Sequence, residues 1–233
     1  MNINNFIDYL GKLGIKYTNC QLNQLEMYYE ILIEYNKVMN LTGITNKEDV
    51  YLKHFYDSLT ISKIIDLNNY NSLCDIGTGA GFPGIVLKIF YPNLKVTLID
   101  SLNKRINFLN DVIQKLKLTN IEAIHCRIEE YAKINREKYD IVTARAVAPL
   151  NILLEYAIPI VKSGKYFIAM KGKEENEELY HNAIKILQSE ICNICKFKLP
   201  IENSERTLYK IKKNNKTSNK YPRKYIEIKK KSL

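Results

Sequence analysis

The stretch Asp75-Ile76-Gly77-Thr78-Gly79-Ala80-Gly81-Phe82-Pro83-Gly84 places an acidic residue and four glycines directly after a short apolar run. That run, residues 72–76, predicts a strand, and Pro83 with the apolar residues that follow it predicts a helix. Glycine adopts positive φ easily and lets a ligand approach main-chain N–H groups without meeting a Cβ. The stretch therefore predicts a cradle for a nucleotide-type cofactor, and a glycine-rich turn without a ligand is the alternative.

Two kinds of cofactor fit this loop. Its second half matches the dinucleotide fingerprint, and its alternating glycines after Asp75 match the loop that holds S-adenosylmethionine. Asp100, at the end of the next expected strand, suits the ribose hydroxyls of either cofactor. Asp75 favours S-adenosylmethionine, because its carboxylate can face the cationic amino-acid part of that molecule but would be repelled by a pyrophosphate. Methyl transfer is thus favoured over hydride transfer.

The rest of the chain alternates between strand-like and helix-like segments. Residues 1–70 read as helical, with a break at 40–45, and predict a cap that packs on the remaining α/β body. We expect strands at 72–76, 95–100, 121–126, 139–144, 165–171, 191–199 and 207–211. We expect one helix that begins at residue 83, a second that ends at residue 118, and two more at 150–161 and 174–189. The alternation predicts a mostly parallel seven-stranded sheet covered on both faces, with one antiparallel strand in a closing hairpin.

The positive charge is concentrated at the end of the chain. Residues 206–233 hold eleven Lys or Arg and the single acid Glu227. The net charge of this segment is therefore +10, the same as that of the whole sequence. Tyrosines lie between these cations, so the segment predicts an arm for nucleic acid, in which lysines meet phosphates and rings stack on bases. A solubilising lysine-rich tail is an equal alternative. If the arm binds RNA, deletion of residues 214–233 should weaken RNA binding and leave cofactor affinity intact.

Composition restricts the class of protein further. Five cysteines, three histidines and no apolar run of membrane-spanning length predict a reduced cytoplasmic protein with no membrane segment. Cys192 and Cys195 lack a second ligand pair at zinc spacing, so we expect no metal. We divide the chain into the cap at 1–70, a cofactor-binding domain at 71–213 and a basic tail at 214–233, and we expect a monomer.

Short motifs in a fixed order extend over nearly the whole chain. They are Asn36 with Asn40-Leu41-Thr42, His54-x-x-Asp57-Ser58, the loop 75–84, Asp100-Ser101-x-x-Lys104-Arg105, Arg127-x-Glu129, Ala144-Arg145-Ala146-Val147-Ala148, Lys171-Gly172, Arg206 and Tyr221-Pro222-Arg223-Lys224. In order and spacing the chain resembles the bacterial 16S ribosomal RNA guanine-N7 methyltransferases of the glucose-inhibited-division B (RsmG) family. After Lys224 it departs from the Ala-Gly-Thr-Pro that is common in that family and reads Tyr225-Ile226-Glu227-Ile228.

The resemblance implies a Rossmann-like class I S-adenosylmethionine-dependent fold and a substrate in the small ribosomal subunit. It implies cofactor contacts at Gly77, Phe82, Ile128, Glu129 and Arg145, to which the loop argument adds Asp75, Gly79 and Asp100. For Glu129 a helix-dipole role is the alternative, and for Arg145 a salt bridge to Asp75 or Asp140. The expected RNA contacts are Lys171, Arg206, Arg223 and Lys224.

No catalytic base is expected for this chemistry. Guanine N7 carries an in-plane lone pair, so an enzyme needs only to hold it in line with the methyl group. We read His54, Asp57 and Ser58 as the seam between cap and cofactor domain. Another methyl acceptor, an NAD-dependent oxidoreductase and a non-catalytic RNA-binding protein are the alternatives that the sequence leaves open.

Overall fold

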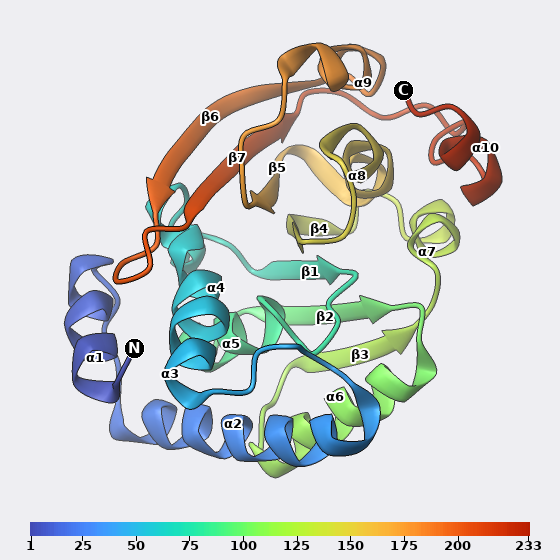
Figure 1. Ribbon diagram of the computed structural model, residues 1–233. Helices are drawn as coiled ribbons and strands as arrows, with labels where there is room; N and C mark the ends of the chain where they lie inside the picture. The colour runs from blue at the N-terminus through green and yellow to red at the C-terminus, as the bar shows by residue number, and fades with distance from the viewer.

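The computed structural model describes residues 1–233 and contains one seven-stranded sheet (Figure 1). The strands are β1 (Ser72–Ile76), β2 (Lys95–Asp100), β3 (Ile121–His125), β4 (Tyr139–Arg145), β5 (Val161–Lys171), β6 (Ser189–Lys198) and β7 (Glu205–Lys213). Their order is β3-β2-β1-β4-β5-β7-β6, and only β7 runs against its neighbours. The predicted fold class, with one antiparallel strand in a closing hairpin, is confirmed.

Two hydrophobic cores lie on the two faces of this sheet. One contains residues of α5 (Gly84–Phe90) and α6 (Asn103–Lys115), and the other contains residues of α7 (Ile128–Ile134), α8 (Leu150–Ala157) and α9 (His181–Ile186). β1 and β4 are almost entirely buried because both of their faces are covered, which explains why most of their residues are apolar.

The first 70 residues form the expected helical cap. It comprises α1 (Ile3–Lys12), α2 (Asn19–Met39), the continuous helical segment α3 (Lys47–Val50), η1 (Tyr51–Tyr56), α4 (Asp57–Leu59) and η2 (Thr60–Lys63), and the short turn η3 (Leu67–Asn69). α2 begins at a capping box between Thr18 and Gln21 and packs on α5 and α6. The cap has no core of its own, since Leu25 and Leu32 of α2 belong to the same apolar cluster as the sheet.

One predicted helix is much shorter in the structure. Residues 174–189 form only the turn η5 (Glu177–Leu179) and α9. Elsewhere, the short turn η4 (Ile158–Ile160) directly precedes β5. Glu175 donates its backbone N–H to the Tyr209 hydroxyl at 2.8 Å, and the Asn176 side chain caps the short turn. The first N–H groups of a helix have no partner within the helix. Here the N–H of Glu175 binds Tyr209 and the N–H of Glu178 binds the Asn176 side chain, so the helical turn begins only after residue 176.

The last residues of the chain differ from the expected separate arm. They include α10 (Tyr225–Lys230), which lies beside α7 in Figure 1, at the edge of the sheet where β1, β2 and β3 end. Ile228 of α10 is 1% exposed and belongs to the second core. The segment is therefore packed on the body. None of the helices is long and apolar enough to cross a membrane.

Candidate functional site

A cavity of about 470 Å³ opens at the carboxyl ends of β1, β2, β3 and β4. Open α/β sheets bind ligands at this edge, and the volume lies in the range of small-molecule sites. The residues that line it are Ile76, Gly77, Ile99, Asp100, Ser101, Arg105, Cys126, Arg127, Ile128, Glu129, Ala146, Val147, Ala148, Ile152, Tyr156, Tyr225, Ile228 and Lys229. Of the expected cofactor contacts, the structure brings Gly77, Asp100, Ile128 and Glu129 together here.

Gly77, in the loop after β1, lies close to Val147 in the loop after β4. Its φ is +65°, and a Cβ built on it would lie 2.7 Å from Cγ2 of Val147. Ala146, the neighbour of Val147, also has a positive φ of 56°, which is rare for a residue with a Cβ. A glycine is needed at position 77 both for its backbone angle and for space, so the cavity floor there is bare backbone.

Asp75 does not line the cavity in the structure, so its predicted contact with the ligand stays a prediction. The side chain is fully buried, and its Oδ2 accepts from the Thr78 hydroxyl at 2.7 Å and from the Gly84 N–H at 2.8 Å. Burial raises the pKa of Asp75 to about 7. Its Oδ1 has no hydrogen-bond partner. The residue holds the two ends of the glycine loop together.

Asp100 lies at the cavity wall and also shapes it. Its Oδ2 accepts from the Gly79 N–H at 3.0 Å and from Arg105 at 3.1 Å, and its Oδ1 accepts from the Leu102 N–H at 3.0 Å. Gly79 itself does not line the cavity. Its role in the structure is to carry the N–H that binds the end of β2 to the glycine loop.

Ile128 and Glu129 form the first turn of α7, directly after β3. Glu129 is 6% exposed, and its carboxylate lies 3.9 Å from Arg127. The helix dipole favours a carboxylate in the first helical turn. Glu129 therefore has this dipole role and also lines the cavity. Ile128 adds an apolar side chain to the same wall.

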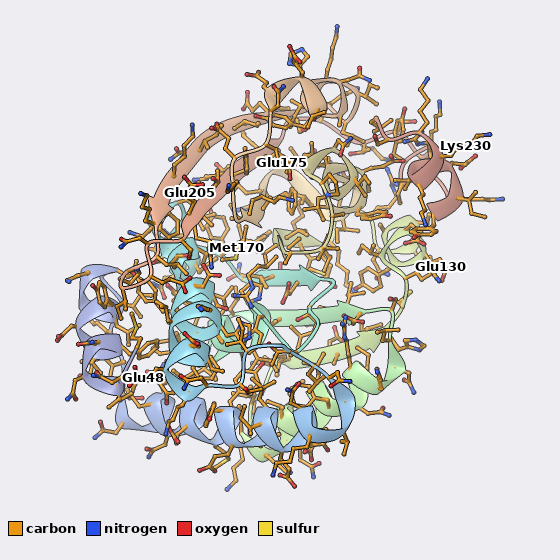
Figure 2. All side chains as sticks on the ribbon, in the orientation of Figure 1. Glu48, Glu130, Met170, Glu175, Glu205 and Lys230 are labelled. Carbon is orange, nitrogen blue, oxygen red and sulfur yellow. The ribbon has the colours of Figure 1, made fainter.

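A second hollow, of about 420 Å³, lies at the ends of β4 and β5. Its lining contains four cations and one carboxylate: Lys53, Arg145, Lys171, Arg206 and Asp57. Figure 2 labels Met170 of the same lining at the end of β5, with Glu175 in the loop beyond it. The two hollows share one residue, Ala146. Among the lining residues positive side chains outnumber negative ones, which favours an anionic ligand.

Arg145 lies in this second hollow, and its partner is a carboxylate of the cap. It donates to Oδ2 of Asp57 at 3.1 Å and to the Lys53 carbonyl at 3.0 Å. The expected alternatives, Asp75 and Asp140, are wrong, because Asp140 binds Lys162 and the start of β1, while Asp75 is enclosed by the glycine loop. Arg206 binds the other oxygen of Asp57 at 2.9 Å.

Phe82 belongs to the glycine loop and lines neither hollow. Its ring stacks on the His54 ring, with centroids 4.4 Å apart, and the Arg145 guanidinium lies 5.2 Å from its centre. Burial, followed by the positive Arg145, lowers the pKa of His54 to about 3. The imidazole is therefore neutral at neutral pH. With Asp57 it forms the seam between cap and sheet that we read in the sequence.

The expected RNA residues have different surroundings. Lys171 donates to the Ala148 carbonyl at 2.7 Å and pairs with Glu175, and it still lines the second hollow. Arg223 is bound by both oxygens of Glu155, at 2.9 and 2.7 Å, so its guanidinium serves the fold and is not a free RNA contact. Lys224 is exposed at the start of α10.

Sequence reasoning missed the part of the first cavity that α8 and α10 supply. Ile152 and Tyr156 come from α8, and Tyr225, Ile228 and Lys229 come from α10. The available signal was the pair Tyr225 and Ile228 at helical spacing within an otherwise basic tail. That pair marks the face of α10 that meets the body.

Comparisons with known proteins identify the family. Residues 21–208 match the family model described as GidB, rRNA small subunit methyltransferase G. Ribosomal RNA small subunit methyltransferase G of Bacillus cytotoxicus is 52% identical over 228 residues, covering 96% of this chain and 95% of that protein. The protein of the same name from Bacillus thuringiensis is 50% identical over the same shares.

Solved structures share the fold at low sequence identity. A SAM-dependent methyltransferase from Aquifex aeolicus has a TM-score of 0.53 at 18% identity, covering 71% of this chain and 93% of that one. TYW2 of Pyrococcus horikoshii, in complex with MeSAdo, has a TM-score of 0.52 at 16% identity, covering 66% and 60%. The fold agrees with the family match. Because the family model covers most of the chain and the relatives are 50–52% identical, the chain belongs to the GidB family of rRNA small subunit methyltransferase G.

Proposed function

We propose that this protein transfers a methyl group from S-adenosylmethionine to guanine N7 of 16S ribosomal RNA in the small ribosomal subunit. Membership of the family supports the reaction and the substrate class. Because the proposed substrate is ribosomal RNA, we place the reaction in the cytoplasm. We expect a monomer as the active form.

The first cavity is the proposed cofactor site. S-adenosylmethionine supplies a methyl group on a sulfonium, which is intrinsically electrophilic. Gly77 leaves bare backbone for the close approach of this cofactor, Asp100 offers a carboxylate edge to ribose hydroxyls, and Ile128 offers an apolar surface to adenine. The fold neighbours named for SAM and MeSAdo support the same cofactor class.

The observation that carries the proposal is the junction of the two hollows at Ala146. An apolar cavity with a glycine floor suits a nucleoside-type cofactor, and a cationic hollow beside it suits the phosphates of an RNA. A base that enters from the RNA side reaches the cofactor side past one small side chain. We assign Arg145, Lys171 and Arg206 to the RNA side.

The chemistry at N7 agrees with the side chains at this junction. The lone pair of guanine N7 is free at neutral pH, so no residue has to remove a proton before the transfer. His54, whose pKa is about 3, is neutral and places no positive charge beside the base. Arg145 is held by Asp57, and its remaining donors suit guanine O6 or a phosphate, since a donor on N7 itself would block methylation.

The test is transfer of labelled methyl from S-adenosylmethionine to small ribosomal subunits taken from a strain that lacks the modification. We expect the label in 7-methylguanosine of 16S RNA, identified by mass spectrometry of the nucleosides. Label in a different nucleoside would contradict the proposed atom. Binding of S-adenosylhomocysteine without any labelled RNA would contradict the proposed acceptor.

A matched pair of lysines tests the second hollow separately. Lys53 lines it and pairs with Glu202, whereas Lys47, on the same cap, pairs with Glu26 and lies outside it. Lys53→Met should raise the KM for subunits severalfold and reduce the slope of log KM against log salt by about one. Lys47→Met should change neither value. Equal effects of the two variants would remove the second hollow from the RNA site.

A further inference from the structure

The end of the chain contributes a wall to the proposed cofactor site. Tyr225, Ile228 and Lys229 of α10 line the first cavity together with the strand ends of the sheet. Ile228 is 1% exposed and serves the core, whereas Tyr225 is 42% exposed, so part of its ring surface is free. Of the three, Tyr225 combines an aromatic face with access to the cavity.

The segment before α10 is fixed to the body at two places. Arg223 binds the buried Glu155 of α8 through its side chain and through its backbone N–H at 2.8 Å. On the other side, Arg136 donates to the carbonyls of Thr217 at 2.5 Å and of Tyr221 at 2.6 Å. α10 follows directly after these anchors, so its position over the cavity is determined by charge-assisted hydrogen bonds.

The Tyr225 ring of α10 contacts the residue that precedes α7. The Arg127 guanidinium lies 5.4 Å from the centre of the Tyr225 ring, and Arg127 directly precedes Ile128 and Glu129. Lys229 lies 5.9 Å from the same ring. These are the distances of cation–π contacts, which hold the ring against the wall where β3 ends.

We propose that Tyr225 contacts the adenosyl part of bound S-adenosylmethionine and that α10 is a component of the cofactor site. The flat face of adenine is the part of this cofactor that an aromatic ring can stack on, and Ile128 offers the opposing apolar surface. The inference rests on the proposed function. It also reverses the expectation from charge alone, which left cofactor affinity independent of residues 214–233.

Calorimetric titration with S-adenosylhomocysteine tests the proposal on the full chain. Tyr225→Ala should weaken binding at least about fivefold, the lower end for loss of one stacking contact. Tyr225→Phe should bind like the parent protein, because the ring is retained. Ile226→Ala is the matched control, since Ile226 is the next residue, is 77% exposed and does not line the cavity.

A second ligand separates a ring contact from a general disturbance of α10. Methylthioadenosine has the adenosyl part and lacks the amino-acid part, so Tyr225→Ala should weaken its binding by the same factor. Unchanged binding of both ligands by Tyr225→Ala, an equal loss in Ile226→Ala, or a loss confined to S-adenosylhomocysteine would overturn the proposal. Failure of the parent protein to bind S-adenosylhomocysteine would instead overturn the proposed cofactor.

Discussion

The guanidinium of Arg145 lies 3.1 Å from Oδ2 of Asp57, so the last residue of strand β4 is bound to the helical cap. The Asp57 carboxyl is 6% exposed and accepts from Arg206 of β7 through its other oxygen. One buried carboxylate therefore joins three parts of the fold at the edge of the second hollow.

Asp57→Asn should lower the free energy of unfolding by about 3 to 5 kcal/mol, the usual cost of removing one member of a buried ion pair. The amide cannot compensate the charges of Arg145 and Arg206, whose side chains are only 14% and 20% exposed. Urea unfolding measures the effect. Asp49→Asn is the control, because the Asp49 side chain is 47% exposed and pairs only with Lys53 at the surface, where such pairs contribute about 1 kcal/mol or less. Equal losses in the two variants would contradict the central role of Asp57.

The sheet could be predicted from the sequence because its signals are local. β1 and β2 are buried on both faces, so each appears as a short apolar run whatever its partner strands are. The glycine loop is equally local, since positive φ at Gly77 and Gly79 depends on the turn itself. These features fixed the fold class and the strand ends at which the first cavity opens.

The partners of the charged side chains could not be predicted in this way. Arg145 and Asp57 are 88 residues apart, and Arg223 and Glu155 are 68 residues apart. A charge in the sequence does not indicate which of 25 carboxylates it will meet once the elements pack. For the same reason the charge of the tail suggested an arm, whereas Arg223 on Glu155 and Arg136 on two carbonyls of the tail fasten it beside the cavity.

Gly77→Ala should weaken binding of S-adenosylhomocysteine about tenfold or more, because its Cβ would push Val147 into the cavity that both residues line. Gly79→Ala is the matched control: its φ of +62° gives the same backbone strain, but nothing lies within 4 Å of the added Cβ. Calorimetry on both variants separates crowding from strain. The double variant Gly77→Ala with Val147→Ala should regain affinity, and a lack of rescue would show that strain alone is responsible.

His54 should make the protein less stable in acid. Its pKa is about 3 in the folded chain and 6.5 when unperturbed, so folding favours the neutral ring. The stabilisation is present above pH 6.5 and is lost as the pH falls towards 3. Arg145 approaches Nδ1 at 3.3 Å, which is where the second proton would be added. In His54→Gln, urea unfolding between pH 6.5 and 4 should lose this acid sensitivity, and an unchanged pH profile would contradict the buried neutral ring.

Asp75 should act in the opposite direction over nearly the same pH range. Its pKa is about 7 in the folded chain and 3.8 when unperturbed, so folding favours the protonated acid. The stabilisation is complete below pH 3.8 and is lost as the pH rises through 7, a difference on the order of 4 kcal/mol. Asp75→Asn keeps a neutral side chain at all pH values and removes this contribution. The variant should therefore lose stability steeply between pH 7 and 4, because His54 then acts alone, whereas the two contributions largely offset each other in the parent protein. Parallel stability profiles for the variant and the parent across that range would contradict the raised pKa of Asp75.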